Sequence, residues 1–198
     1  MSPFELVFAV YGLLLGLAVA EVLGGFSRTL KLKRGTKPIK VGWLTPLLGI
    51  LVILDLTSFW LIAWETRDQI AANYLTLIGV LSIVGIYYLA ATLIFPDQPE
   101  EWPDFDDWYD KQNRLVIGGL LAANVGTWIG NIGLEIAKPT PEAELAMTDS
   151  EMLVVWAGLA VLGLLIALLK VKSRRWNIVL LVSVSALLLV FGIAEEFV

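Results

Sequence analysis

Long apolar runs alternate with short polar segments along the whole chain. Six runs occupy residues 4–26, 42–64, 74–95, 115–136, 152–169 and 176–194. A helix needs about 20 apolar residues to cross about 30 Å of hydrocarbon, and each run is close to this length. Core helices of water-soluble proteins rarely stay apolar for so long. The pattern therefore predicts an all-α, polytopic integral membrane protein with six transmembrane helices in a single domain.

The first run has the position of a secretory signal peptide but not its features. It is longer than the roughly 7–15 apolar residues of a signal core, and no Lys or Arg precedes Arg28. We therefore expect this run to be a retained transmembrane helix.

The positions of Lys and Arg predict how the helices are oriented. Nearly all of the 14 basic residues lie in the segments after the first, third and fifth runs. If all six runs cross the bilayer, these segments share one side. The positive-inside rule places that side in the cytoplasm and both termini on the non-cytoplasmic side. The arrangement is typical of small multi-pass proteins of a bacterial inner (plasma) membrane, which is the location that we expect.

The composition excludes several kinds of chemistry. The chain contains no Cys and no His, which excludes disulfides, thiol chemistry, imidazole catalysis and ordinary zinc sites. We expect no cofactor and no metal ion. The basic residues lie next to the apolar runs, where they suit topology and lipid headgroups rather than nucleic acid.

Segment 96–114 is acidic, although it lies on the predicted basic side. Pro103 suits the first turn of a helix, and the acids that follow suit its positive end. We therefore expect the fourth membrane helix to begin early and to project from the bilayer. The segment either pairs with the neighbouring basic segments, binds a divalent cation, or docks another protein. The candidate docking residues are Trp102, Phe105, Asp106, Asp107, Tyr109 and Asp110.

Polar side chains within the apolar runs are candidate functional residues, because ionisable groups inside a bilayer are costly. Asp55 lies near the middle of the second run, with no basic residue at its depth. The fourth run places four polar residues on one helical face. The predicted seam for a proton or small cation, between the first, second and fourth helices, contains Asp55, Glu21, Asn124, Thr127, Asn131, Glu135 and Ser58. Alternatively, the Asn and Thr side chains only hydrogen-bond between packed helices.

The remaining runs suggest contacts with lipid or with other subunits. The fifth and sixth runs contain few polar residues, so we expect them to face lipid or a neighbouring subunit. In the first run, Gly12, Gly16, Ala20 and Gly24 recur at every fourth position. Such small residues permit close packing of helices and favour a homo-oligomer or a subunit of a membrane complex.

Three functions are compatible with these features. The first is a non-enzymatic accessory subunit or oligomeric scaffold, which the sequence favours because no catalytic constellation is present. The second is a proton or small-cation channel or transporter that uses the intramembrane carboxylates. The third is an enzyme acting on lipid through paired carboxyl groups. However, Glu21 and Asp55 are offset by roughly 10 Å in depth, which is beyond hydrogen-bonding reach.

Overall fold

The computed structural model describes residues 3–35, 39–70, 73–137 and 149–194, and within these residues it is helical. Its elements are α1 (Pro3–Lys33), α2 (Leu44–Glu65), α3 (Tyr74–Thr92), the short 3-10 helix η1 (Pro99–Glu101), α4 (Phe105–Ala137), α5 (Asp149–Lys170) and α6 (Arg174–Ala194). All six α-helices are long and apolar enough to cross a membrane. The predicted all-α fold with six membrane-spanning helices is confirmed, and the sidedness of the termini stays a prediction.

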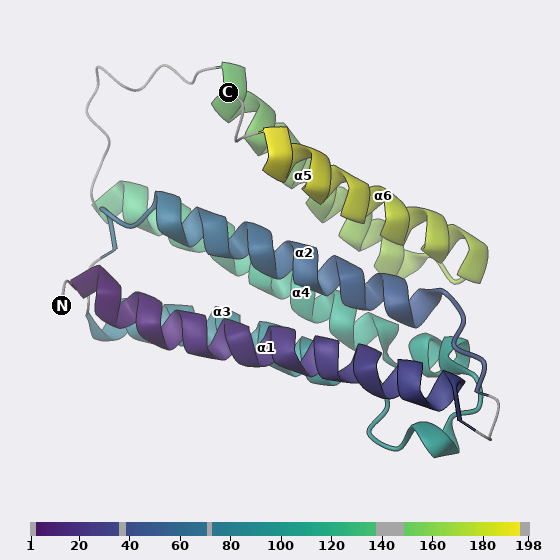
Figure 1. Ribbon diagram of the computed structural model, residues 1–198. Coiled ribbons are helices and arrows are strands. Elements are labelled where there is room, and N and C mark those ends of the chain that lie inside the picture. The colour runs from purple at the N-terminus through teal and green to yellow at the C-terminus, as the bar shows by residue number, and fades with distance from the viewer. Residues whose placement is uncertain (1–2, 36–38, 71–72, 138–148, 195–198) are drawn as a thin grey trace.

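The six helices form three layers of two (Figure 1). α1 lies beside α3, α2 beside α4, and α5 beside α6; the α2–α4 layer contacts both others. We call the end of the bundle that carries Lys40, Asp104 and Arg174 the charged end. We call the opposite end, where α2 ends at Glu65 and α4 ends at Ala137, the cavity end. Because successive helices run in opposite directions, α1 begins and α6 ends at the cavity end.

Helix α4 begins well before the fourth apolar run, as the sequence predicts. It starts at Phe105, and the preceding Asp104 caps it, because the Asp104 Oδ1 atom accepts a hydrogen bond from the Asp106 N–H at 2.9 Å. The helix then continues without interruption to Ala137. The acidic segment and the fourth apolar run are therefore joined in one rigid element.

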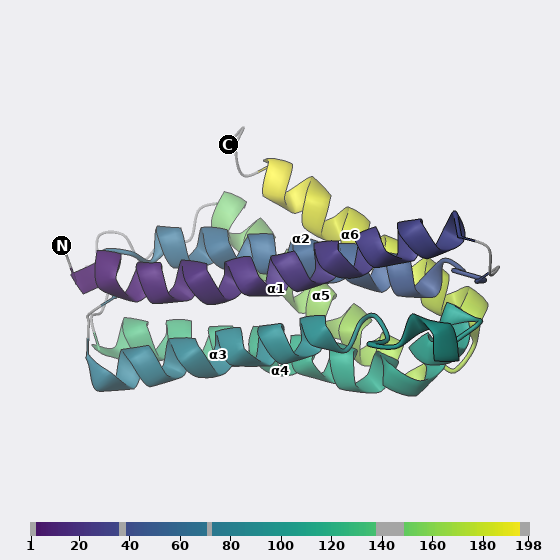
Figure 2. The same ribbon diagram turned by 60° about the horizontal axis from the view of Figure 1, so that its bottom comes forward.

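Burial along the middle layer stops part of the way toward the cavity end. The last buried residue of α2 is Phe59, and the last buried residue of α4 is Thr127. Beyond these residues the α5–α6 layer diverges from the α2–α4 layer (Figures 1 and 2). The final turns of α2 and α4 are consequently not packed against α5 and α6.

The outside of the bundle is apolar. Large hydrophobic side chains are exposed on every one of the six α-helices, which suits lipid and not water. The exposed indoles lie toward the two ends: Trp43 and Trp176 toward the charged end, and Trp60, Trp64 and Trp156 toward the cavity end. Such positions are typical of the interfacial regions of a bilayer.

Gly42 should be intolerant of any side chain. Its φ angle is +57°, in the left-handed region, and a Cβ atom added there would collide with the Asp106 carboxylate. We expect Gly42→Ala to lower the free energy of unfolding by about 1–3 kcal/mol. The matched control is Gly163→Ala on α5, where an added Cβ meets nothing within 4 Å. Unfolding titrations that show equal stabilities for the two variants would contradict this reading of Gly42.

Candidate functional site

A cavity of about 530 Å³ lies between α2, α4, α5 and α6, on the side of the bundle nearer the cavity end. Its wall has two chemical faces. Nearly all of its polar lining comes from α2 and α4, whereas α5 and α6 contribute only apolar residues and glycine. The volume falls within the roughly 300–1,000 Å³ that is usual for small-molecule sites. The residues that form the polar face are Asp55, Ser58, Glu65, Thr66, Tyr87, Asn124, Thr127, Asn131 and Glu135.

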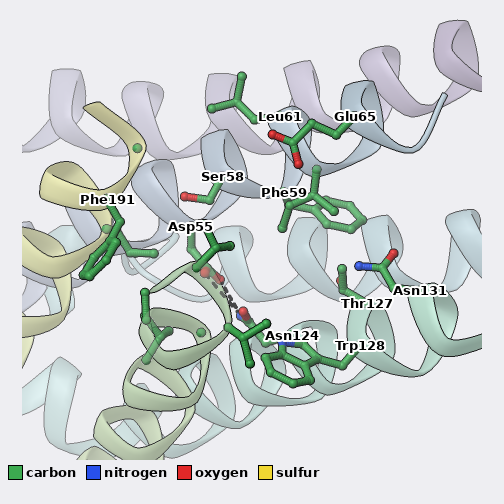
Figure 3. Close-up of a pocket in the computed structure, with 18 of the residues that line it drawn as sticks. Asp55, Ser58, Phe59, Leu61, Glu65, Asn124, Thr127, Trp128, Asn131 and Phe191 are labelled. Carbon is green, nitrogen blue, oxygen red and sulfur yellow. Dashed lines mark hydrogen bonds between the residues drawn. The ribbon is translucent and has the colours of Figure 1, made fainter. Parts of the chain in front are cut away.

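Asp55 lies at the deep end of this polar face and is only 3% exposed. Its Oδ2 atom accepts hydrogen bonds from the Tyr87 hydroxyl and from Asn124 Nδ2, both at 2.9 Å. Figure 3 shows the Asp55 and Asn124 side chains pointing toward one another across the gap between α2 and α4. Tyr87 reaches the same carboxylate from α3. Three helices thus converge on one carboxyl group.

The partners of Asp55 are neutral donors. In the part of the chain that the structure describes, no residue lining the cavity is Lys or Arg. The donors satisfy the carboxylate oxygens as hydrogen-bond acceptors, but they do not neutralise a negative charge. A charge held away from water without an opposite charge is strongly unfavourable. The arrangement therefore suits a proton on Asp55 or a cation beside it.

Six of the seven residues of the predicted seam line this cavity. The α4 residues Asn124, Thr127, Asn131 and Glu135 share one helical face, and Asp55 and Ser58 face them from α2. The hydroxyls of Ser58 and Thr127 donate to carbonyls of their own helices, Leu54 O and Ala123 O. Of the Asn and Thr side chains that were predicted to bond between helices, Asn124 does so, whereas Thr127 bonds within its own helix.

Glu21 does not belong to this cavity, so its place in the predicted seam is wrong. Its carboxylate pairs with Arg28 on the same helix, at 3.0 Å, and both side chains are substantially exposed. The long Arg28 side chain reaches back along α1 past Gly24, where a Cβ atom would lie 3.9 Å from Arg28 Nη1. Glu21 and Asp55 therefore do not form a carboxyl pair of the kind that an acid–base enzyme needs.

Helices α5 and α6 also differ from expectation. The sequence predicts that they face lipid or a neighbouring subunit, but in addition one face of each closes the cavity through Val161, Leu187, Leu188 and Phe191. Trp128 of α4 occupies the space that Gly158 of α5 leaves, since a Cβ on Gly158 would lie 2.9 Å from the indole. The Trp128 indole therefore fills the contact between α4 and α5 at the cavity wall.

Tyr87 is the partner of Asp55 that the sequence did not reveal. It lies in an apolar run beside a second tyrosine, Tyr88, and it carries no charge that marks it out. Its hydroxyl nonetheless donates to Asp55, and its ring packs in the core with its centroid 5.3 Å from that of Phe59. The feature that could have identified Tyr87 is its hydroxyl, a polar group within an apolar membrane helix.

The acidic segment pairs with the two basic segments at the charged end. Lys40 Nζ lies 2.6 Å from Asp104 Oδ2. Arg174 donates to Asp110 Oδ2 from Nε at 2.8 Å and to Asp107 Oδ1 from Nη2 at 2.6 Å. The backbone of Leu44 at the start of α2 donates to Asp106 at 3.4 Å. These contacts support the internal-pairing interpretation of segment 96–114.

Two of the three aromatic residues of the predicted docking surface are buried. Phe105 and Tyr109 are both buried within the bundle, because α4 belongs to the middle layer. Trp102 packs edge-on against Trp108 with ring centroids 4.9 Å apart, and the Lys111 ammonium lies over Trp102. Trp108 in turn donates to the last carbonyls of the α3 end, at Leu93 and Ile94. The aromatic residues therefore stabilise the charged end rather than present a face to a partner.

The Lys40–Asp104 pair perturbs both of its pKa values. Burial alone would raise the pKa of Asp104, but the hydrogen bond from Lys40, the Asp106 N–H and the positive charges of Lys40 and Arg174 lower it overall. The hydrogen bond to Asp104, followed by its negative charge, raises the pKa of Lys40. The pair thus stabilises the fold across the range in which both groups are charged.

Asp104→Asn should lower the midpoint of thermal unfolding slightly near neutral pH. At very low and at very high pH, the variant and the native protein should melt at the same temperature. The Asp104 contribution is present above the ordinary pKa of Asp and is lost as the pH falls through the lowered value. The Lys40 contribution is present below the ordinary pKa of Lys and is lost as the pH rises through the raised value. Asn can still cap α4, so the substitution isolates the ion pair. Melting curves that differ by the same amount at every pH would contradict the pairing.

Toward the charged end, the space between the same four helices is filled. Buried apolar side chains occupy it in the described residues: Leu48, Leu51 and Val52 of α2, Ile117 and Leu120 of α4, Leu165 and Leu168 of α5, and Leu181 and Val184 of α6. The polar lining therefore ends at Asp55 and the cavity is closed on that side.

Comparison with known proteins finds no matching family model, and no significant match to a curated protein or to a solved structure.

Proposed function

We propose that this multi-pass membrane protein is non-enzymatic and binds a proton or a small cation at Asp55. The observation that carries the proposal is a buried carboxyl group, held by two neutral donors, at the deep end of a cavity whose described lining contains no basic residue. Ionisable groups at such depths in a membrane usually serve ion or proton binding. The polar face from Asp55 to Glu135 supports entry from the cavity end.

The filled space beyond Asp55 favours binding from one side over conduction. A channel needs a continuous path whose lining replaces the hydration shell of the ion. Here the apolar side chains of Leu51, Leu120 and Val184, all fully buried, lie on the charged side of Asp55. Passage through the protein would require the α5–α6 layer to move away from the α2–α4 layer. We therefore propose one-sided uptake and release as the activity of the resting structure.

Association with a second copy stays a prediction. Its support is now confined to α1, where Gly16 and Ala20 are exposed on the outside of the bundle and an added Cβ at Gly16 meets nothing within 4 Å. Small exposed residues on a membrane helix allow close approach of another helix. The charged end offers less support, because its aromatic residues are used internally.

Thiol labelling tests whether the cavity is reached by water from the cavity end. The chain has no cysteine, so Ser58→Cys and Asn131→Cys report on the cavity alone. We expect both to react with a small membrane-impermeant reagent from the side on which Asp68→Cys reacts. Lys172→Cys marks the opposite side, and Leu51→Cys is the buried control. Unreactive cavity positions, or labelling only from the Lys172 side, would overturn the proposal.

A further inference from the structure

We infer that the cation held at Asp55 is an amphipathic organic cation, a monovalent ammonium group on an apolar body. This inference rests on the proposed function and names the class of ligand for the same site. The cavity of about 530 Å³ is much larger than a single inorganic ion requires and matches the size of sites for small organic molecules.

The charge of the cavity selects the sign of the ligand. Its deepest ionisable group is the Asp55 carboxyl, whose hydrogen-bond donors Tyr87 and Asn124 are neutral. The described lining contains no basic side chain. A carboxylate held between low-dielectric walls attracts cations and excludes anions.

Aromatic rings lie one helical turn from the two groups that meet at the deep end. Phe59 follows Asp55 by four residues on α2, and Trp128 follows Asn124 by four residues on α4, so each lies on the same face as its partner. Both rings line the cavity. Trp128 is the more open of the two, because Phe59 is buried against Tyr11 and Tyr87. The face of an aromatic ring attracts an ammonium group, most strongly where water is excluded. The deep end therefore combines a carboxylate with aromatic surface.

The wall opposite the polar face suits the apolar body of the ligand. Val161 of α5 and Leu187, Leu188 and Phe191 of α6 present hydrocarbon to the cavity. An inorganic ion would gain nothing from this wall, whereas an alkyl or aromatic body is removed from water by it. A ligand with its ammonium group at Asp55 would place its apolar part against α5 and α6.

Three probes separate the contributions of charge and apolar body. They are hexyltrimethylammonium, tetramethylammonium, which lacks the hexyl chain, and hexyl sulfate, which has the opposite charge. Binding is measured by calorimetry on the protein in lipid nanodiscs, with empty nanodiscs correcting for partition into lipid. We expect hexyltrimethylammonium to bind more tightly than tetramethylammonium and hexyl sulfate not to bind at the site.

Two variants and two matched controls locate the binding. Asp55→Asn removes the charge, and because Tyr87 and Asn124 can also donate to an amide oxygen, the packing is kept. Gly192→Leu fills the α6 wall, where an added Cβ meets nothing within 4 Å. Glu21→Gln removes a membrane carboxyl outside the cavity. Gly163→Leu adds the same side chain as Gly192→Leu at an equally open position of α5 that does not line the cavity.

The expected result is a loss of hexyltrimethylammonium affinity of at least about tenfold in Asp55→Asn. Gly192→Leu should weaken hexyltrimethylammonium but not tetramethylammonium, and both controls should bind like the native protein. If tetramethylammonium binding depends on Asp55 but the hexyl chain adds no affinity, the ligand class is wrong and the cation site stands. If no cation distinguishes the native protein from Asp55→Asn, the inference and the proposed function both fail.

Discussion

Asp55→Asn is expected to reduce the binding of a small inorganic cation such as sodium at least about tenfold. The carboxylate of Asp55 is the deepest charged group of the cavity, and its hydrogen bonds come from neutral Tyr87 and Asn124. An amide in its place retains the hydrogen bonds but supplies no charge to balance the cation. Equilibrium binding of radioactive sodium to the protein in nanodiscs measures the effect.

Two further variants test whether sodium binding depends on the position of the negative charge. Glu21→Gln removes a carboxylate that pairs with Arg28 on α1 outside the cavity, so sodium binding should be unchanged. Asp55→Glu keeps the charge but moves it by one methylene, so an intermediate affinity is expected. If Glu21→Gln and Asp55→Asn reduce sodium binding equally, the cation responds to the total charge of the protein and not to the cavity.

Gly25→Leu should be among the most destabilising single substitutions in the chain. An added Cβ at Gly25 of α1 would overlap the ring of Phe95, which follows α3. The two helices are held there by the edge-on contact of Phe26 with Phe95, at 5.1 Å between centroids, and Phe26 itself fits against Gly49 of α2. Overpacking at such a contact costs about 1–3 kcal/mol and sometimes more.

The adjacent glycine supplies the control for this prediction. A Cβ on Gly24 would meet only the flexible end of Arg28, at 3.9 Å, so Gly24→Leu should unfold at nearly the same denaturant concentration as the native protein. Thermal or denaturant unfolding of the purified protein compares the two variants. A Phe95→Leu substitution should restore part of the stability lost in Gly25→Leu. Equal losses at both positions would mean that Gly25 is not a packing contact.

Helical periodicity predicted which residues share a face, and this part of the site could be read from the sequence. The spacing of Asn124, Thr127, Asn131 and Glu135 placed them on one side of a helix. The length of the apolar runs predicted six helices, and Pro103 with the following acids predicted the early start of α4. These features depend only on residues that are close together along the chain.

The neighbours of each helix could not be predicted in the same way. In a bilayer, lipid is as apolar as the protein interior, so an apolar run does not reveal which of its faces is buried. The inclusion of Glu21 and the omission of Tyr87 follow from this, because α3 and not α1 completes the environment of Asp55. The role of α5 and α6 as a cavity wall was hidden for the same reason.

The charged end shows a related limit. Pairing of the acidic segment with the basic segments is one of three alternatives that the sequence leaves open, and the contacts of Lys40 and Arg174 support it, since opposite charges attract each other at short range. Phe105 and Tyr109 are predicted docking residues, but both lie on the face of α4 that is buried in the bundle. The layer to which α4 belongs is a property of the whole fold.

The most direct test of the account is the ionisation of Asp55 with and without a cation. We expect a proton on Asp55 when no cation is present and a carboxylate when one is bound, because a buried charge without an opposite charge is unfavourable. Infrared difference spectra of the protein in lipid, recorded on adding sodium or tetramethylammonium at constant pH, measure this exchange. We expect the carbonyl stretch of a protonated carboxyl group to be replaced by carboxylate bands, and Asp55→Asn to lack the change. Spectra that are the same for the native protein and Asp55→Asn would contradict a cation site at Asp55.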